Sequence, residues 1–269
     1  MLYLHIGLHK TGTTFLQQEL FPKWKGIRYL QEDKLEYLTR MNVEDVYLLS
    51  REGLSGKNWM HADERSTCIR NLSTMLPEAR IILSFRKHSG YIVSSYTQYL
   101  QQGGYLPFEE YFDMDHNRGF MKKEDFLFRR KIEDVQKYFD DMPFVILHED
   151  ILRDLDGLIK RIQGFIGGEA PDIHSINRRS HNKSVGYYPA MALRRLNKVS
   201  KSELNPDGRY DLYNWRFKRI GVDPRSLCQY RFNFFPKKSF ISDSLKDTID
   251  HYYCDDWAYV CELGSDASK

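Results

Sequence analysis

The first glycine-rich loop of the chain has the residue types that bind a phosphate group. An apolar segment runs into residues 7–14 (GLHKTGTT), and a helical pattern follows. A strand that passes through a tight glycine turn into a helix points backbone N–H groups and the positive end of the helix dipole at one place. Gly12 permits the turn, and Thr13 and Thr14 add hydroxyl groups. The sequence therefore predicts an anion-binding loop, with an ordinary β-to-α turn as the alternative.

The lysine of this loop stands at an unusual place. Gly7 and Gly12 match the spacing of the phosphate loop GxxxxGK[ST], but Thr13 occupies the lysine position of that motif and Lys10 lies inside the loop. An ammonium group at Lys10 would lie beside the terminal group of a bound phosphate ester, where charge develops on the leaving group. We therefore expect Lys10 to act in group transfer and to make a magnesium ion less necessary.

The elements that position this loop alternate between strands and helices. Near-continuous apolar runs indicate the strands of a parallel sheet that is covered on both faces. The predicted strands are Leu2–Gly7, Val46–Ser50, Arg80–Phe85 and Pro143–Leu147, and the predicted helices are Thr13–Leu20, Ala62–Met75, Tyr91–Gln101, Leu152–Ile166 and Ser244–Leu263. The sequence thus predicts an α/β fold of three layers, a parallel sheet flanked by helices.

Length and composition indicate one globular domain over residues 1–269, with 41% hydrophobic and 29% charged residues. We expect its core at about 1–185, an insertion at about 105–142, and a mainly helical or irregular, basic and aromatic-rich cap at about 187–245. No apolar stretch is long enough for a membrane span, and the N-terminus lacks the pattern of a signal peptide. The four cysteines form no CxxC pair, which favours free thiols in the cytoplasm over a zinc site.

Basic charge is concentrated late in the chain. Residues 178–238 hold 15 Lys and Arg against 4 Asp and Glu, a net charge of +11, although the whole chain carries only +3. This distribution predicts a surface that faces an anion, with a merely solvated surface as the alternative.

Four segments resemble, in order, the motifs of sulfotransferases that use 3′-phosphoadenosine 5′-phosphosulfate (PAPS). The loop HKTGTTFLQ is similar to their phosphosulfate loop, Lys-x-Gly-Thr-Thr after the first strand. The segment RIILSFRKHSGYIVSSYTQY resembles their 3′-phosphate motif, with Arg86, Ser94 and Tyr96 at the matching positions. The segment FVILHEDILRDLDGLIKRIQGFIG resembles a strand-plus-helix unit, and RRSHNKS at 178–184 resembles the basic loop that closes over the nucleotide in bacterial members. The resemblance implies a P-loop-like sulfotransferase fold, closest to bacterial and carbohydrate-type members.

The resemblance also implies two separate anion sites, because PAPS carries a 5′-phosphosulfate and a 3′-phosphate. Ligands of open α/β sheets bind beyond the carboxyl ends of the strands, where the guanidinium of Arg86 offers bidentate contacts to phosphate. A strand-end arginine and a helix-surface serine at position 94 are the structural alternatives. The residues expected to hold PAPS are His9, Lys10, Thr11, Gly12, Thr13, Thr14, Arg86, Ser94, Arg179, Asn182, Lys183 and Ser184. No metal ion is expected to be required.

The implied reaction is in-line transfer of a sulfuryl group to a hydroxyl or an amine, with 3′,5′-adenosine bisphosphate (PAP) leaving. Lys10 would stabilise the leaving group. The family has a glutamate or a histidine as base near the end of its second core strand, which gives Glu52 that role. His61 is the rival base, and an ion pair between Glu52 and Arg51 is the structural alternative.

The acceptor is expected to be a carbohydrate, a glycolipid or another small hydroxyl compound, and no nucleic acid is expected as a partner. Two other functions stay open. A P-loop kinase with a displaced lysine would bind ATP with magnesium held by a strand-end carboxylate, for which Asp150 is available. A non-catalytic module on the same scaffold would bind a polyanion through residues 178–238.

Overall fold

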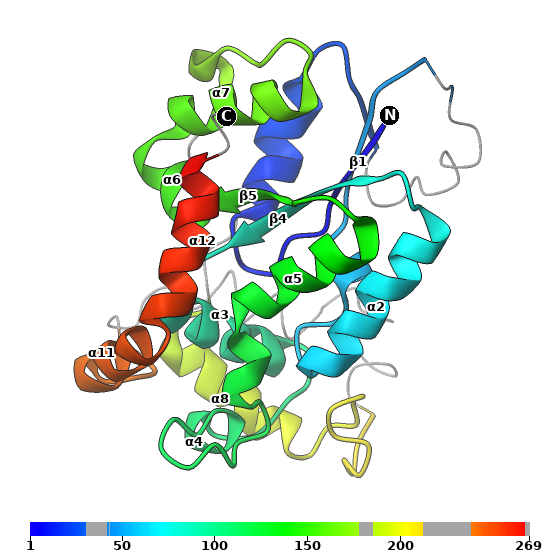
Figure 1. Ribbon diagram of the computed structural model, residues 1–269. Helices are drawn as coiled ribbons and strands as arrows, with labels where there is room; N and C mark the ends of the chain where they lie inside the picture. The colour runs from blue at the N-terminus through cyan, green and yellow to red at the C-terminus, as the bar shows by residue number, and fades with distance from the viewer. Residues whose placement is uncertain (31–41, 43, 178–184, 212–237, 267–269) are drawn as a thin grey trace. The chain divides into compact units, whose positions relative to one another are not determined.

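The computed structural model describes residues 1–30, 42, 44–177, 185–211 and 238–266 (Figure 1). The chain divides into two compact units. The first unit comprises Met1–His88, Phe126–His181 and Asp250–Lys269, and the second comprises Ser89–Asp125 and Asn182–Ile249. The sheet belongs to the first unit.

Five strands form one parallel sheet in the order β2-β3-β1-β4-β5, which confirms the predicted α/β class. The strands are β1 Leu2–His5, β2 Arg28–Leu30, β3 Tyr47–Ser50, β4 Arg80–Phe85 and β5 Phe144–Leu147. All four residues of β1, β3 and β5 are buried, which is why these strands appear as continuous apolar runs in the sequence. The sequence did not predict β2, a three-residue edge strand whose first residue is exposed. In this order, β1, β3, β4 and β5 all end at one edge of the sheet.

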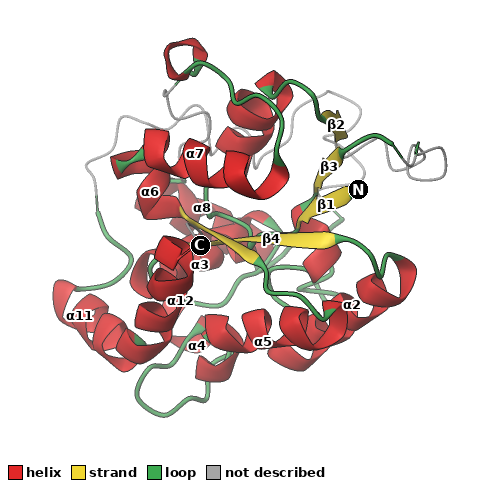
Figure 2. Cartoon of the chain, turned by 45° about the horizontal axis from the view of Figure 1, so that its top comes forward, coloured by secondary structure: helices red, strands yellow, loops and turns green. Residues whose placement is uncertain are grey.

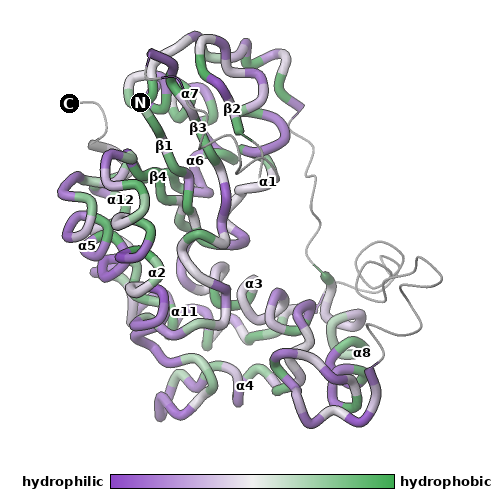
Figure 3. Tube along the Cα trace, turned by 90° about the vertical axis from the view of Figure 1, so that its right-hand side faces the viewer, coloured by the Kyte–Doolittle hydropathy of each residue, from purple (hydrophilic) through white to green (hydrophobic). Residues whose placement is uncertain are grey.

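Helices cover both faces of this sheet, and they form the outer two of three layers (Figures 1 and 2). One face packs against the helical segment after the first loop, namely α1 Thr13–Phe15, η1 Leu16–Leu20 and η2 Phe21–Lys23, and against α7 Leu155–Ile166. The other face packs against α2 Ala62–Met75, α5 Phe128–Phe139 and α12 Cys254–Asp266. Figure 3 shows hydrophobic stretches along β1 and β4, whereas the helices mix hydrophobic and hydrophilic residues. The helices therefore bury one side each.

Two segments predicted as single helices are each two helices. Asp154 separates α6 His148–Arg153 from α7, because its φ and ψ of −142° and 64° leave the helical region and its carboxylate caps α7. Tyr253 separates α11 Asp243–Tyr252 from α12, and its ring stacks on the buried His88 with centroids 4.3 Å apart. These interruptions come from single residues that the hydrophobic pattern does not reveal.

The second unit is helical and rich in aromatic side chains. It contains α3 from Ser89, within the helix His88–Gln101, α4 Phe108–Tyr111, most of η5 Lys123–Phe126, and α8 Tyr187–Asn197. Its aromatic core is formed by Tyr96, Tyr99, Phe108, Tyr111, Phe120 and Phe240. Among the described residues, no helix combines the length and the apolar character that crossing a bilayer requires.

The predicted insertion at 105–142 is split between the two units. Its last part forms α5, which packs in a layer of the first unit, whereas α4 belongs to the second. The single-domain organisation over residues 1–269 stays a prediction.

Candidate functional site

The first-strand loop leaves β1 at the edge where the central strands end, and two glycines set its path. A Cβ on Gly7 would lie 2.8 Å from Nε2 of His5 and 2.9 Å from Cβ of Ser84. Gly12 has a φ of +92°, and its Cβ would lie 2.6 Å from Cδ1 of Ile151. Only glycine fits at these two positions without a shift of its neighbours, so the loop is held close to the sheet and to α6.

Two threonines of the loop contact its own backbone, whereas Lys10 lies near Glu52. The hydroxyl of Thr11 donates to the carbonyl oxygen of Leu8 at 2.6 Å, and the hydroxyl oxygen of Thr13 lies 3.5 Å from the same oxygen, so both residues stabilise the loop from within. Lys10 has a φ of +68°, a backbone conformation that non-glycine residues rarely adopt and that occurs at functional sites. Burial lowers the pKa of Lys10, and the nearby Glu52 carboxylate opposes that shift. Lys10 and Glu52, predicted from different strands, therefore lie within electrostatic reach of each other.

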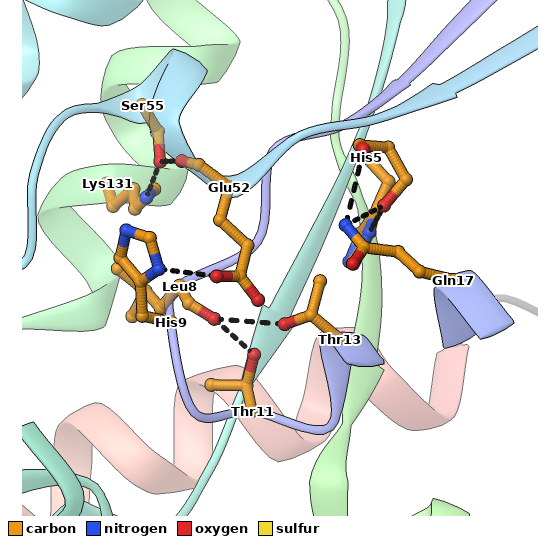
Figure 4. Close-up of polar contacts among 10 residues, drawn as sticks. His5, Leu8, His9, Thr11, Thr13, Gln17, Glu52, Ser55 and Lys131 are labelled. Carbon is orange, nitrogen blue, oxygen red and sulfur yellow. Dashed lines mark hydrogen bonds and ion pairs between the residues drawn. The ribbon is translucent and has the colours of Figure 1, made fainter. Parts of the chain in front are cut away.

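Glu52 begins the turn η4, Glu52–Ser55, directly after β3, and forms an ion pair with His9. Its Oε2 contacts Nδ1 of His9, and each side chain is 22% exposed (Figure 4). Burial by itself raises the pKa of Glu52, but hydrogen bonds from His9 and Thr13 and the charge of His9 outweigh it and hold this pKa below its usual value. The carboxylate is therefore ionised at neutral pH, and its ion-pair partner is His9. Arg51 is the partner that the sequence offered only as the structural alternative to the role as base.

His5 links three strands directly beneath the loop. Its Nδ1 lies 2.7 Å from Oγ of Ser50 on β3, and its Nε2 lies 2.6 Å from Oγ of Ser84 on β4. The ring is fully buried, and burial lowers its pKa from 6.5 to about 4. A neutral ring has one donor and one acceptor nitrogen, which two serine hydroxyls can satisfy. His5 therefore holds the ends of β1, β3 and β4 together.

Lys131 on α5 is a residue that the sequence analysis missed. It is 7% exposed, and its Nζ donates to Oγ of Ser55, 2.8 Å away, in the turn that begins with Glu52 (Figure 4). The signal in the sequence is a lysine inside the apolar stripe of a helix, formed by Phe128, Ile132, Val135 and Phe139.

Arg86 follows β4 and lies near the residues that follow β5. Burial lowers its pKa, and the Glu149 carboxylate opposes that shift. Burial, and next the charge of Arg86, lowers the pKa of His148. His148 also faces the first loop, because its Cδ2 would lie 3.3 Å from a Cβ on Gly12. The sheet therefore brings the loop and Arg86 to one edge.

The other predicted residues of the 3′-phosphate motif belong to the second unit. Ser94 is buried rather than on the helix surface, and its carbonyl oxygen accepts from the hydroxyl of Thr97. Tyr96 is fully buried in the aromatic core, and its hydroxyl donates to the carbonyl oxygen of Leu106 at 3.0 Å. The ring of Tyr96 thus packs inside the second unit.

His61, the rival base, lies at the start of a helix, and the predicted residues of the late basic loop are not described by the structure. His61 precedes α2, and its backbone N–H donates to the Glu64 carboxylate at 2.8 Å, which starts that helix. Arg179, Asn182, Lys183 and Ser184 lie outside the described residues. Within the described ranges, no group of three or more His, Cys, Asp or Glu side chains is arranged to hold a metal ion.

A comparison with models of protein families shows the family to which this chain belongs. A model described as "Sulfotransferase domain" matches residues 3–222. The chain belongs to this sulfotransferase family. Sulfotransferases transfer a sulfuryl group, so the resemblance drawn from the loop and the later motifs is confirmed at that level. No curated protein sequence matches the chain. Among solved structures, a sulfotransferase from Alicyclobacillus acidocaldarius is 15% identical with a TM-score of 0.44, covering 80% of this chain and 99% of that chain.

Proposed function

We propose that this sulfotransferase moves the sulfuryl group of PAPS to a hydroxyl of a carbohydrate, a glycolipid or another small acceptor. The proposal rests on one observation: Lys10 lies within electrostatic reach of Glu52 at the carboxyl edge of the sheet, where Glu52 also forms an ion pair with His9. A cation for the leaving group and a carboxylate for the acceptor proton are the two groups that this reaction needs.

The residues around the loop fit the donor PAPS, because they offer donors to an anion. The backbone amides of residues 9–14 precede and open a helical segment, Lys10 adds an ammonium, and His9 lies beside it. When bound, PAPS supplies the activated sulfuryl group and PAP as the leaving group. Arg86, at the end of β4, would hold the 3′-phosphate through its guanidinium. The roles of Ser94, Arg179, Asn182, Lys183 and Ser184 in binding PAPS stay predictions from the sequence.

The chemical step is a displacement at sulfur. The acceptor oxygen forms a new bond to sulfur as its proton passes to the Glu52 carboxylate, which His9 and Thr13 hold in its ionised form. The bond between sulfur and the bridging oxygen breaks, and its electron pair stays on the phosphate of PAP. Lys10 stabilises that negative charge, and the protein supplies mainly positioning and electrostatics.

Two further features bear on the alternatives. Asp150, the carboxylate that a kinase would need for magnesium, forms an ion pair with Arg161 within the first unit. In the second unit, the side chain of Tyr188 is 40% exposed, and an exposed aromatic face suits a sugar ring. A carbohydrate acceptor and the cytoplasmic location expected from the cysteine pattern are both part of the proposal.

Calorimetric titration of the full chain with PAP in EDTA, beside AMP and ATP, tests the proposal. We expect micromolar binding of PAP without metal, and loss of about 10- to 100-fold in affinity on Arg86→Ala, because a charged hydrogen-bond donor is removed. Arg80→Ala, at the opposite end of β4, is the matched control and should keep the affinity. Binding of ATP only after magnesium is restored would instead favour the kinase.

A further inference from the structure

Lys131 occupies a position where a hydrophobic side chain would pack. It lies on the buried face of α5 among Phe128, Ile132, Val135 and Phe139, and only 7% of it is exposed. Arg65, itself 8% exposed, lies close enough that its charge, after burial, is the second cause that holds the pKa of Lys131 well below its usual value. Placing an amine there costs stability, so its hydrogen bond to Ser55 is the feature to explain.

That contact leads directly to the turn that carries Glu52. The Nζ of Lys131 donates to Oγ of Ser55 at 2.8 Å. The hydroxyl of Ser55 donates in turn to the backbone carbonyl oxygen of Glu52 at 3.2 Å, and Ser55 is 2% exposed (Figure 4). Ser55 thus accepts one hydrogen bond and donates another, and the second of these links the two ends of the turn Glu52–Ser55.

The turn is anchored at both of its ends. At Glu52, the carboxylate contacts His9 of the first loop, and at Ser55, the hydroxyl accepts from Lys131. The two partners come from different parts of the unit, the loop after β1 and the helix α5. An offset of about 1 Å in a reacting group can cost about 100-fold in rate, so a second anchor on a four-residue turn has a catalytic consequence.

We propose that Lys131 is a positioning residue for sulfuryl transfer, which fixes through Ser55 the turn that presents the Glu52 carboxylate to the acceptor. The inference rests on the proposed function, because it takes Glu52 as the base. Lys131 itself touches neither donor nor acceptor.

Hydrogen exchange of the purified full chain, followed by mass spectrometry, tests the anchoring without any substrate. In Lys131→Met the peptide covering residues 51–58 should exchange several-fold faster, while the melting temperature stays equal or rises, because a buried amine is replaced by an apolar side chain of similar length. Ser55→Ala removes the hydroxyl that accepts from Lys131 and donates to the carbonyl oxygen of Glu52, and it should give the same change. This variant also serves if Lys131→Met does not fold. Lys160→Met, 73% exposed on α7, is the control. Unchanged exchange of residues 51–58 in the variants would overturn the proposal.

Measurements of transfer activity test the positioning role of Lys131 separately from the role of Glu52 as base. With PAPS and n-octyl β-D-glucoside as the probe acceptor, kcat of Lys131→Met should fall about 10- to 100-fold with the Kd for PAP unchanged. The double variant with Ser55→Ala should lose no more than either single variant, because both break one chain of contacts. Full turnover in Glu52→Gln would overturn the role of Glu52 and with it the catalytic part of this inference, whereas faster exchange would still establish the anchor. If the wild type does not use the probe, the exchange result alone decides.

Discussion

Glu52 and His9 form an ion pair between two loops that follow adjacent strands, β3 and β1. Since the strands are parallel, they end at the same edge, and the topology alone brings these two loops together. Burial raises the pKa of Glu52, but His9 and Thr13 lower it by more, so the pair keeps a charged carboxylate beside Lys10. Changes at Glu52, His9 or Lys10 should therefore alter the reaction in different, measurable ways.

Replacing Glu52 by Gln removes the base and keeps the shape of the side chain. We expect turnover to fall about 100- to 10,000-fold, because that is the usual contribution of a positioned general base, while PAP affinity stays nearly intact. Steady-state transfer from PAPS and calorimetry with PAP measure the two effects. The control is Glu169→Gln, 68% exposed and paired with Lys25 on the surface. Loss of PAP binding in Glu52→Gln would mean that Glu52 only supports the loop.

The pH profile depends on the partner of Glu52. A lowered pKa leaves the carboxylate ionised above that value, so Glu52 should cause no loss of kcat/KM as pH falls from 7 to about 5. In His9→Asn the largest lowering influence is removed, so the acid limb of the profile should move to higher pH. Profiles of wild type and variant between pH 4.5 and about 8 measure this shift. An acid limb at the same pH in both would show that His9 does not act on the base.

Lys10→Ala removes the cation expected at the leaving oxygen. Transfer should fall at least about 100-fold, in line with the loss of one preorganised donor in other active sites, whereas the amides of the loop should retain part of the PAP affinity. Single-turnover rates with PAPS, beside PAP titration, distinguish catalysis from binding. Lys25→Ala, 74% exposed, controls for a change in net charge. Transfer that is unaffected by Lys10→Ala would refute the mechanism.

The sequence predicted the sheet and the loop because both leave strong local signals. Buried parallel strands appear as apolar runs, and the loop carries glycines at fixed spacing, so β4 and α2 match their predicted bounds. The partner of Glu52 was not predictable, since His9 and Arg51 are both plausible until the order of β3 and β1 is known. Lys131 was missed for the same reason: its contact with Ser55 spans 76 positions, and no local pattern encodes it.

His5 should make stability depend on pH. Its folded pKa of about 4 lies below the unfolded value of 6.5, so its contribution is complete above pH 6.5 and is lost as pH falls toward 4. The loss amounts to about 3 kcal/mol by linkage. Urea denaturation at several pH values measures it, and the comparison with His5→Asn removes the contributions of other groups. The variant should be less stable at pH 7 but flatter below 6.5, and equal slopes would contradict the lowered pKa.

Two glycines provide a matched pair for the loop. Gly12→Ala places a Cβ 2.6 Å from Ile151 at a φ of +92°, so the loop must shift. We expect PAP affinity to fall at least about 10-fold, together with a loss of about 1–2 kcal/mol in stability for the left-handed backbone. Gly164→Ala on α7 meets no atom within 4 Å and has an ordinary helical backbone, so it should raise stability by about 0.5–1 kcal/mol with PAP affinity unchanged. Calorimetry and thermal unfolding of both variants measure these effects. Because both changes add one methyl group, a difference in PAP binding reports the conformation of the loop. Equal binding would place the 5′-phosphate of PAP away from Gly12.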